Sequence, residues 1–138
     1  MEFRMYDALP QEAAEIRKEV FLEEQGFKKE FDEFENESKH FVLYVEGQGA
    51  GTARVRLASE FGAFKIGRIA LKNEYRGRHF GEALVSFAEE WVKSQGGKET
   101  VILAQNKAIG FYEKLCYAKT DITRQKEHCP HTLMKKSL

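Results

Sequence analysis

The chain has 138 residues, which is enough for one domain with a single hydrophobic core, and we expect residues 1–138 to form that domain. Apolar residues make up 42% of the sequence and charged residues 32%, a balance typical of globular proteins. Lys and Arg together number 22, as do Asp and Glu, so no excess of positive charge favours a nucleic-acid partner. No apolar run approaches the roughly 20 residues that span a bilayer, and the N-terminal segment lacks the pattern of a secretion signal. We therefore expect a cytoplasmic protein without a membrane partner.

The two cysteines, Cys116 and Cys129, have no neighbouring Cys or His at the spacing of a zinc site. Cysteines of cytoplasmic proteins stay reduced, so we predict that these two form no bridge essential to the fold. We expect no metal cofactor.

The N-terminal part of the chain predicts a strand, a helix and an acidic segment. Residues 2–6 are expected to form a strand, followed by a helix with Asp7 as its cap, Pro10 in its first turn and Gly26 at its end. Its buried face carries apolar residues at helical spacing: Leu9, Ala13, Ile16 and Val20. Residues 28–38 are rich in carboxylates and are expected to form a solvated loop or a short second helix.

Three strands are predicted in the middle of the chain. Residues 40–46 form an almost unbroken apolar run, which indicates a buried strand. Residues 51–58 alternate between two faces, with Ala53, Val55 and Leu57 on one and Thr52, Arg54 and Arg56 on the other. Residues 64–71 form the third strand, in which Gly67 indicates a bulge or a close backbone approach.

A long helix follows that third strand. One face of its 3.6-residue repeat is apolar, with Phe80, Leu84, Phe87, Ala88 and Trp91. The other face is polar, with Glu82, Ser86, Glu89, Glu90 and Lys93. Gly96 and Gly97 come where a left-handed residue is expected to end a helix.

The remaining elements complete a mixed fold. Residues 100–104 predict a buried strand, residues 106–115 a short helix, and residues 117–123 and 131–135 two final strands. Antiparallel strands come first and strand-helix-strand units later, so the order predicts an α/β (α+β) fold with a mixed central sheet and helices on both faces.

The loop from Arg76 to Gly81 joins a strand to the N-terminus of a helix, which is a favourable place for an anion. Free backbone N–H groups and the helix dipole favour a phosphate there, and glycines allow a close approach. Arg76 and Arg78 add positive charge. The alternative is an ordinary strand-turn-helix with two solvated arginines.

This loop resembles the acyl-CoA-binding motif of the GCN5-related N-acetyltransferases (GNATs), Arg/Gln-x-x-Gly-x-Gly/Ala. Arg76 takes the first position and Gly81 the last, whereas His79 stands where the middle glycine is usual. If that glycine supplies a positive φ, His79 has a steric cost to bear. A protonated His79 would instead favour the phosphate, and a third possibility is a tolerated residue at the helix start.

A second region, residues 104–117, resembles the GNAT signature around Phe/Leu-Tyr-Glu-Lys-Leu. It matches at Ala108, Phe111, Tyr112, Glu113, Lys114, Leu115 and Tyr117, whereas Gln105 and Cys116 replace the usual Asn and Gly. The ElaA-like (YjcF-like) branch of the family is similar over nearly the whole chain, including residues 17–25, 30–35, His40 and 127–134.

The resemblance implies a GNAT fold, in which a mostly antiparallel sheet is splayed at a β-bulge. It implies direct transfer of an acetyl group from acetyl-CoA, as co-substrate, to a primary amine of a small molecule or peptide in a ternary complex. The residues expected to bind the cofactor are Ile69, Ala70, Leu71, Arg76, Gly77, Arg78, His79, Phe80, Gly81, Glu82, Gln105 and Tyr112.

Two residues receive catalytic roles from the resemblance. The N–H group of Leu71 is expected to stabilise the oxyanion, and Tyr112 to protonate the departing thiolate. The alternative for Tyr112 is an aromatic side chain that packs on its helix, and for Phe111 we expect a place in the core. The amine must also lose a proton, for which the candidates are Glu24, Glu30, Asp32 and His131. Each carboxylate has the alternative of a surface charge, and His131 that of a structural histidine.

Two other kinds of protein compete with an enzyme. A module that binds acyl-CoA with little catalysis remains open because of His79 and Cys116, whereas Tyr112 favours the enzyme. A nucleotide-binding domain is disfavoured because the glycine patterns of such sites are missing. The sequence leaves the acceptor and the choice between monomer and homodimer open.

Overall fold

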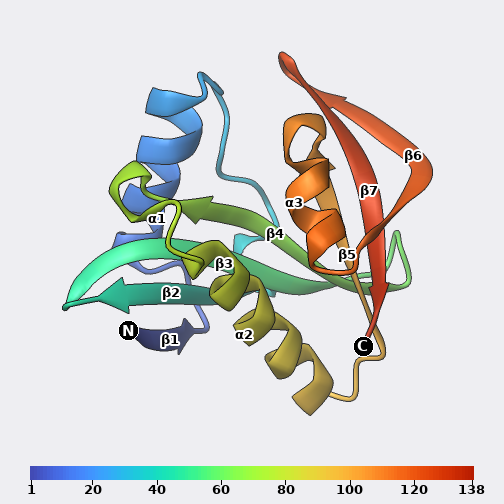
Figure 1. Ribbon diagram of the computed structural model, residues 1–138, viewed down its shortest axis with the longest axis horizontal. Coiled ribbons are helices and arrows are strands. Elements are labelled where there is room, and N and C mark those ends of the chain that lie inside the picture. Colours follow the sequence, from blue (N-terminus) through green and yellow to red (C-terminus); the bar gives the residue numbers. More distant parts are fainter.

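The computed structural model describes all 138 residues, and a seven-stranded sheet runs through its centre (Figure 1). The strand order is β1-β2-β3-β4-β5-β7-β6. The strands are β1 (Glu2–Tyr6), β2 (Lys39–Val45), β3 (Gln48–Ala58), β4 (Ala63–Leu71), β5 (Glu99–Gln105), β6 (Ala118–Lys126) and β7 (Cys129–Ser137). Neighbouring strands are antiparallel except β4 and β5, which are parallel. The prediction of a mixed, mostly antiparallel sheet is confirmed.

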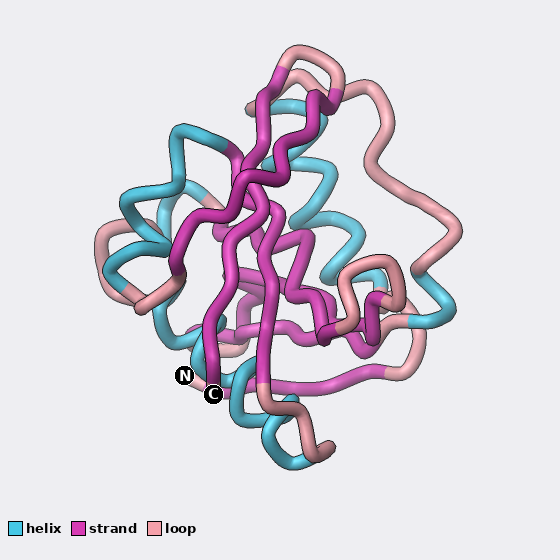
Figure 2. Tube along the Cα trace, turned by 90° about the vertical axis from the view of Figure 1, so that its right-hand side faces the viewer, coloured by secondary structure: helices cyan, strands magenta, loops and turns pink.

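Helices cover both faces of this sheet (Figures 1 and 2). On one face lie α2 (Phe80–Ser94) and α3 (Ile109–Lys114), and on the other lies α1 (Gln11–Arg17), which continues as the π-helical turn η1 (Lys18–Glu24). Three short 3-10 turns complete the structure: η2 (Glu35–Glu37), η3 (Asn73–Tyr75) and η4 (Asn106–Ala108). None of the helices has the length and apolar character needed to cross a membrane.

The apolar face of α2 is buried against the sheet as predicted, but its polar face is not fully solvated. Glu89, predicted to face solvent, is buried. Its carboxylate accepts a hydrogen bond from the Tyr117 hydroxyl at 2.7 Å and pairs with the Lys136 ammonium at 3.0 Å. These two partners come from the far end of the chain, so the helical period alone could not identify the carboxylate as buried.

The first helix begins later than predicted. Its first residue is Gln11, preceded by Pro10, and no side chain caps it. Asp7 was the predicted cap, but its carboxylate pairs instead with the Lys39 ammonium at the start of β2. The predicted end is confirmed, because the helical turns stop before Gly26, whose φ is 76°.

The alternation along β3 is only half confirmed. Ala53 and Val55 lie in the core as predicted, but Leu57 is 65% exposed. Arg54 and Arg56, on the other face, are buried because each forms an ion pair with a carboxylate, at 2.7 Å and 2.5 Å. Paired charges make this face an interior surface as well, which an apolar-polar pattern cannot reveal.

A β-bulge interrupts β4 one residue after the predicted position. Between two register pairs of β3 and β4, one residue of β3 opposes two residues of β4, Arg68 and Ile69. Arg68 adopts a φ of 49°, so it rather than Gly67 is the bulged residue. The extra residue lets the Arg68 side chain reach the segment that precedes β2, while Ile69 still packs against the core.

Both cysteines are free in this structure. Cys116 follows α3 with a φ of 75°. The backbone there therefore adopts the left-handed conformation that a glycine accommodates best.

Candidate active site

Two residues of the loop before α2 adopt the left-handed backbone conformation. Gly77 has a φ of 76° and His79 a φ of 64°. Glycine adopts this conformation freely, whereas a residue with a side chain bears a cost of about 1–2 kcal/mol. His79 therefore bears the steric cost of a positive φ, which was the first of the three alternatives for this residue. Its exposed imidazole lies 3.3 Å from the Glu82 carboxylate.

The N-terminus of α2 presents free backbone donors. No side chain caps this helix, and its first backbone bond runs from the Ala83 N–H group to the His79 carbonyl, at 3.2 Å. The N–H groups of Phe80, Gly81 and Glu82 therefore have no acceptor within the helix. The Arg78 guanidinium lies over the Phe80 ring at 4.9 Å and adds positive charge to a site already suited to an anion.

Arg76 ties the end of β4 to the end of η1. Its Nε donates to the Leu71 carbonyl at 2.9 Å, and its guanidinium pairs with both carboxylate oxygens of Glu24, at 2.5 and 2.8 Å. These hydrogen bonds are the main reason why the pKa of Glu24 is lowered. Glu24 is consequently a weak base, and both side chains have a structural partner.

The sheet opens between β4 and β5. Only residues 64–65 of β4 pair with residues 100–101 of β5. Beyond these pairs a cavity of about 210 Å³, here called the seam cavity, lies between residues 66–69 of β4 and residues 102–105 of β5. The second half of β4 thus carries backbone groups without a partner strand on this side.

The N–H group of Leu71 points toward that opening. The N–H group of Lys72 donates to the carbonyl of Ala50, a residue of β3, at 2.9 Å. Successive N–H groups of a strand point to opposite edges. The N–H group of Leu71 therefore points away from β3, as does its carbonyl, which accepts the hydrogen bond from Arg76. Ile69 and Ala70, the other expected cofactor contacts on β4, pack in the two apolar cores of the protein.

Phe111 does not have the environment expected of it, whereas Tyr112 lies beside the opening between β4 and β5. Phe111, predicted to lie in the core, is 38% exposed, whereas Tyr112 is buried and lines the seam cavity. The Phe111 ring packs over the start of α2, where a Cβ atom added to Gly81 would lie 3.2 Å from it. Burial raises the pKa of the Tyr112 phenol, which keeps its proton in place at neutral pH.

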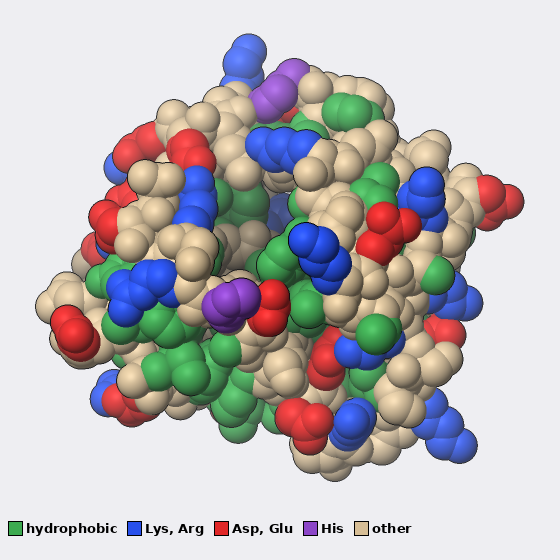
Figure 3. Space-filling model, viewed as in Figure 1, with side chains coloured by type: hydrophobic (Ala, Val, Ile, Leu, Met, Phe, Trp, Pro, Cys, Tyr) green, Lys and Arg blue, Asp and Glu red, His purple; other side chains and the backbone are tan.

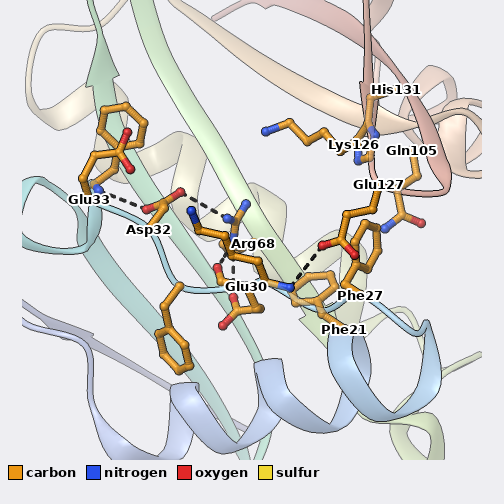
Figure 4. Close-up of a pocket in the computed structure, with 13 residues that line it drawn as sticks. Phe21, Phe27, Glu30, Asp32, Glu33, Arg68, Gln105, Lys126, Glu127 and His131 are labelled. Atoms are coloured by element: carbon orange, nitrogen blue, oxygen red, sulfur yellow. Dashed lines mark hydrogen bonds and ion pairs between the residues drawn. The ribbon is translucent and has the colours of Figure 1, made fainter.

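A larger cavity of about 340 Å³ adjoins the seam cavity and is here called the acceptor cavity. The two share Phe21, Arg68, Gln105 and His131. Aromatic rings from η1 and the following segment form one wall, and the turn between β6 and β7 forms another, with Lys126 and His131 (Figure 4). The surface is hollowed between the α1 side and the α3 side, and basic side chains surround the hollow (Figure 3).

The acidic segment at residues 28–38 contains the short turn η2 and many exposed side chains, and ion pairs hold it against the sheet. Arg17 is 1% exposed and pairs with Glu30, which is also buried, and with Glu35 at 2.6 Å. The Asp32 carboxylate accepts hydrogen bonds from the two terminal guanidinium nitrogens of Arg54, Nη1 and Nη2, each at 2.7 Å. We call these residues and Arg68 the ion-pair network. Its partners come from α1, β3 and β4, so the charges gather only once the chain has folded.

Paired in this way, Asp32 is a poor base. Burial alone would raise the pKa of Asp32, but the hydrogen bonds and the charge of Arg54 hold it well below its usual range. Arg68 lies 3.1 Å from the Asp32 carboxylate and 3.2 Å from that of Glu30. Both carboxylates therefore position Arg68 at the cavity wall.

His131 differs from those carboxylates because one of its nitrogens is free. Its Nδ1 lies 3.0 Å from the Cys129 carbonyl. The carbonyl can only accept, so Nδ1 carries the hydrogen and Nε2 has a free lone pair. Burial lowers the pKa of His131, so its imidazole is neutral at neutral pH. Among the predicted bases it is the one that has a free proton-accepting nitrogen and no ion-pair partner.

Sequence reasoning placed Gln105 at the cofactor site but overlooked other residues of these cavities. Gln105 lies between the two cavities and donates to the Gln25 side chain at 2.8 Å. Arg68 and Lys126 were missed. An arginine within the apolar run of β4 was a signal for the first, whereas Lys126 in a polar strand carried none.

Comparison with known proteins agrees with this geometry. Residues 6–138 match the family model described as an acetyltransferase (GNAT) domain. A protein of Bacillus subtilis (strain 168) named as a candidate acetyltransferase is 40% identical over 129 residues, which cover 90% of this chain and 86% of that protein. The uncharacterized N-acetyltransferase YjcF of the same organism is 33% identical over 104 residues, 74% of this chain and 73% of that protein.

Solved structures share the fold over nearly the whole chain. A candidate N-acetyltransferase from Lactobacillus plantarum has a TM-score of 0.87 and 28% identity, covering 99% of this chain and 97% of that one. Escherichia coli ElaA has a TM-score of 0.84 and 19% identity, covering 98% of both chains. An aminoglycoside 6'-N-acetyltransferase, solved in complex with coenzyme A, has a TM-score of 0.77 and 13% identity, covering 99% and 97%. The chain belongs to the GNAT acetyltransferase family, whose members are acyl-CoA-dependent N-acetyltransferases.

Proposed function

We propose that this enzyme transfers the acetyl group of acetyl-CoA directly to a primary amine of a small molecule or peptide, with both substrates bound at once. The observation that carries the proposal is the opening between β4 and β5, where the seam cavity and the acceptor cavity meet. Tyr112 lines the first and His131 lines both. A thioester at this junction has a proton donor on one side and a proton acceptor on the other.

The cofactor is proposed to lie along the loop before α2 and the open edge of β4. Its pyrophosphate would accept hydrogen bonds from the free N–H groups of residues 78–82, assisted by the charge of Arg78. Its pantetheine arm contains amides and would pair with residues 69–71 as an added strand does. Arg76 is engaged with Leu71 and Glu24, so its part is to hold the end of β4 in place.

The amine and the thioester then meet next to Leu71. Attack on the carbonyl carbon creates an oxyanion, and the N–H group of Leu71, directed toward the opening, is proposed to stabilise it. Removing one such donor typically lowers the rate by about 10²–10³-fold. When the tetrahedral species collapses, the carbon–sulfur bond breaks and the thiolate takes a proton from the Tyr112 hydroxyl.

The proton of the amine goes to His131. An alkylammonium with an intrinsic pKa near 10.4 cannot attack until it is deprotonated. The neutral His131 imidazole, with Nε2 free, is a suitable acceptor at neutral pH. Glu24, Glu30 and Asp32 are assigned structural parts because an arginine holds each of them.

A second candidate function is an acyl-CoA-binding module with little catalysis. Two observations favour it: the positive φ of His79 and that of Cys116, which both stand where glycine is usual in the family. At these two positions, His79 in the cofactor loop and Cys116 after α3, the chain has a side chain where the family pattern has glycine. The paired placement of Tyr112 and His131 favours the enzyme.

The test measures free thiol released from acetyl-CoA in the presence of a panel of small amines and peptides, with calorimetry of acetyl-CoA binding beside it. We expect micromolar binding and amine-dependent thiol release. Binding without release by any amine would support the acyl-CoA-binding module. Lack of binding at millimolar acetyl-CoA would contradict both functions.

A further inference from the structure

A third cavity, of about 200 Å³, continues the acceptor cavity away from the seam. The two share Asp32, Phe34 and Lys126 along their border. We call the third cavity the basic recess; it is lined by Asp32, Phe34, Arg54, Arg56, Glu60, Phe61, Lys65, Leu103, Arg124 and Lys126. A molecule whose amine lies at His131 can therefore extend along a continuous groove into this recess.

The charges of the basic recess do not balance. Both of its carboxylates already have partners, because Asp32 pairs with Arg54 at 2.7 Å and Glu60 pairs with Arg56 at 2.5 Å. Lys65 and Lys126 have no carboxylate within ion-pair distance in the whole structure, and Arg124 donates only to the Thr123 carbonyl, at 2.8 Å. Three cationic side chains thus face the recess without a counter-charge.

Lys65 is the most informative of these three cations. It lies half-buried on β4, directly opposite Arg56 of β3 in the strand register, and like charges in this position destabilise a sheet. Burial, followed by the nearby charges of Lys126 and Arg56, lowers the pKa of Lys65 to about 7. An anion in the recess would offset the repulsion and favour the charged form of the lysine.

We propose that the acceptor is an amine that also carries an anionic group, a carboxylate or a phosphate, and that this group binds in the basic recess while the amine reaches His131. This inference rests on the proposed acetyl transfer and names its substrate class. Lys65, Lys126 and Arg124 would bind the anion, and Phe34, which lines both cavities, would flank the part of the molecule between the two charges.

The test uses pairs of amines that differ only in the anionic group. 4-Aminobutyrate is compared with its amide for the carboxylate, and phosphoethanolamine with ethanolamine for the phosphate. A hydrogen bond to a charged group contributes enough free energy for about a 10–100-fold effect, so kcat/KM should favour the anionic member of at least one pair by that factor. The pair with the larger ratio tells carboxylate from phosphate.

Two variants test whether the recess causes this preference. In Lys65→Met and in Lys126→Gln, the ratio of the two kcat/KM values should fall by about tenfold, mainly through a higher KM for the anionic amine. Lys135→Met is the matched control. It removes a charge from an exposed position of β7, 3.6 Å from Glu99 and outside the three cavities, so the ratio should not change. Melting temperatures of all three variants establish that they are folded.

Calorimetry of each amine in the presence of coenzyme A reports the same preference without turnover. Equal affinity for the members of both pairs, or a preference that survives Lys65→Met and Lys126→Gln, would overturn the inference. Failure of the proposed function has a different signature, in which acetyl-CoA binds and no amine of the whole panel, with or without an anionic group, releases thiol.

Discussion

The cofactor side and the acceptor side of the opening are built in opposite ways. The cofactor side comes from one short stretch, in which the end of β4, a loop and the start of α2 follow one another along the chain. The acceptor side is assembled from η1, the segment at 28–38, the bulge of β4 and the turn between β6 and β7. The first depends on backbone N–H groups, and the second on charged side chains that hold each other in place.

This difference predicts how each side responds to change. A backbone site tolerates most substitutions of its side chains but not those that alter the path of the chain. The acceptor side depends on buried ion pairs, in which the loss of one partner leaves an uncompensated charge. Four substitutions test this contrast, from the largest expected effect to the smallest.

His131→Gln on the acceptor side should have the largest effect on catalysis. Loss of a general base typically lowers the rate about 10²–10⁴-fold, or about 2.7–5.4 kcal/mol. Burial holds the pKa of His131 below the ordinary 6.5, so the base is neutral above that pH and protonated only in more acidic solution. The acidic limb in the pH profile of kcat/KM, measured by thiol release, should disappear in the variant.

His128→Gln is the matched control, because it removes an exposed imidazole from the turn that leads to the same strand. Its rate should stay near that of the wild type. If His131→Gln retains full activity and an unchanged pH profile, His131 is a structural histidine.

Arg17→Met should disrupt the ion-pair network. Arg17 is almost fully buried, and its removal leaves Glu30 without its main partner in the interior. Breaking a buried pair in this way costs about 3–5 kcal/mol of stability, which urea unfolding would measure. Acetyl-CoA affinity of the folded fraction should change little, because Arg17 itself lies on α1 and lines neither the seam cavity nor the loop before α2.

The double variant Arg17→Met/Glu30→Gln should recover part of that loss, since no charge is then left unpaired at this position. A double variant as unstable as Arg17→Met alone would show that packing of the arginine, not charge, is what matters.

Tyr112→Phe should lower turnover with the best amine by roughly 10–10²-fold, or about 1.4–2.7 kcal/mol. The substitution keeps the ring in the seam cavity and removes only the proton donor. Because the lost interaction belongs to the transition state, acetyl-CoA affinity should be unchanged. Unchanged turnover would exclude Tyr112 as the acid, and a large loss of affinity with intact turnover would make it a binding residue.

Tyr117→Phe provides the comparison, because its hydroxyl is also buried but bonds to Glu89 and Thr100 away from the cavities. That variant should lose about 1–2 kcal/mol of stability and keep its turnover.

Gly81→Leu on the cofactor side should weaken acetyl-CoA binding about tenfold, or about 1.4 kcal/mol. A side chain here meets the Phe111 ring, which is exposed and able to move, so the fold should survive while the approach to the α2 N-terminus is obstructed. Calorimetry measures the affinity. Gly110→Ala, where a Cβ atom meets nothing within 4 Å, is the control, and equal affinities for both variants would contradict a backbone site at Gly81.

The elements that follow local rules could be predicted from the sequence. The helix that became α2, the strands around it and the opening of the sheet followed from apolar periodicity, glycine positions and the family resemblance. The bulge was placed one residue early because glycine is the usual residue with a positive φ, whereas the chain uses Arg68 there. Phe111 was wrongly expected in the core because neighbouring aromatic residues on a short helix give no sign of which one faces the core.

The acceptor side could not be predicted because its residues act only through partners far away in the sequence. Residues 28–38 have the composition of a solvated segment. Nothing in their sequence indicates that their carboxylates pair with Arg17, Arg54 and Arg68. Arg54 and Arg56 likewise made one face of β3 look exposed. Pairing of charges converts polar sequence into buried structure, and a single sequence does not reveal which charges meet.

The separation of β4 from β5 affects the stability of the protein and its lifetime in a cell. From Ile66 to Leu71 the edge of β4 has no strand beside it, and such edges invite pairing with other chains. An acyl-CoA arm that occupies this edge binds only the folded chain, and at 100 times its Kd it would stabilise the fold by about 2.7 kcal/mol. The supply of the co-substrate would thus set both the rate of the reaction and the lifetime of the enzyme that performs it.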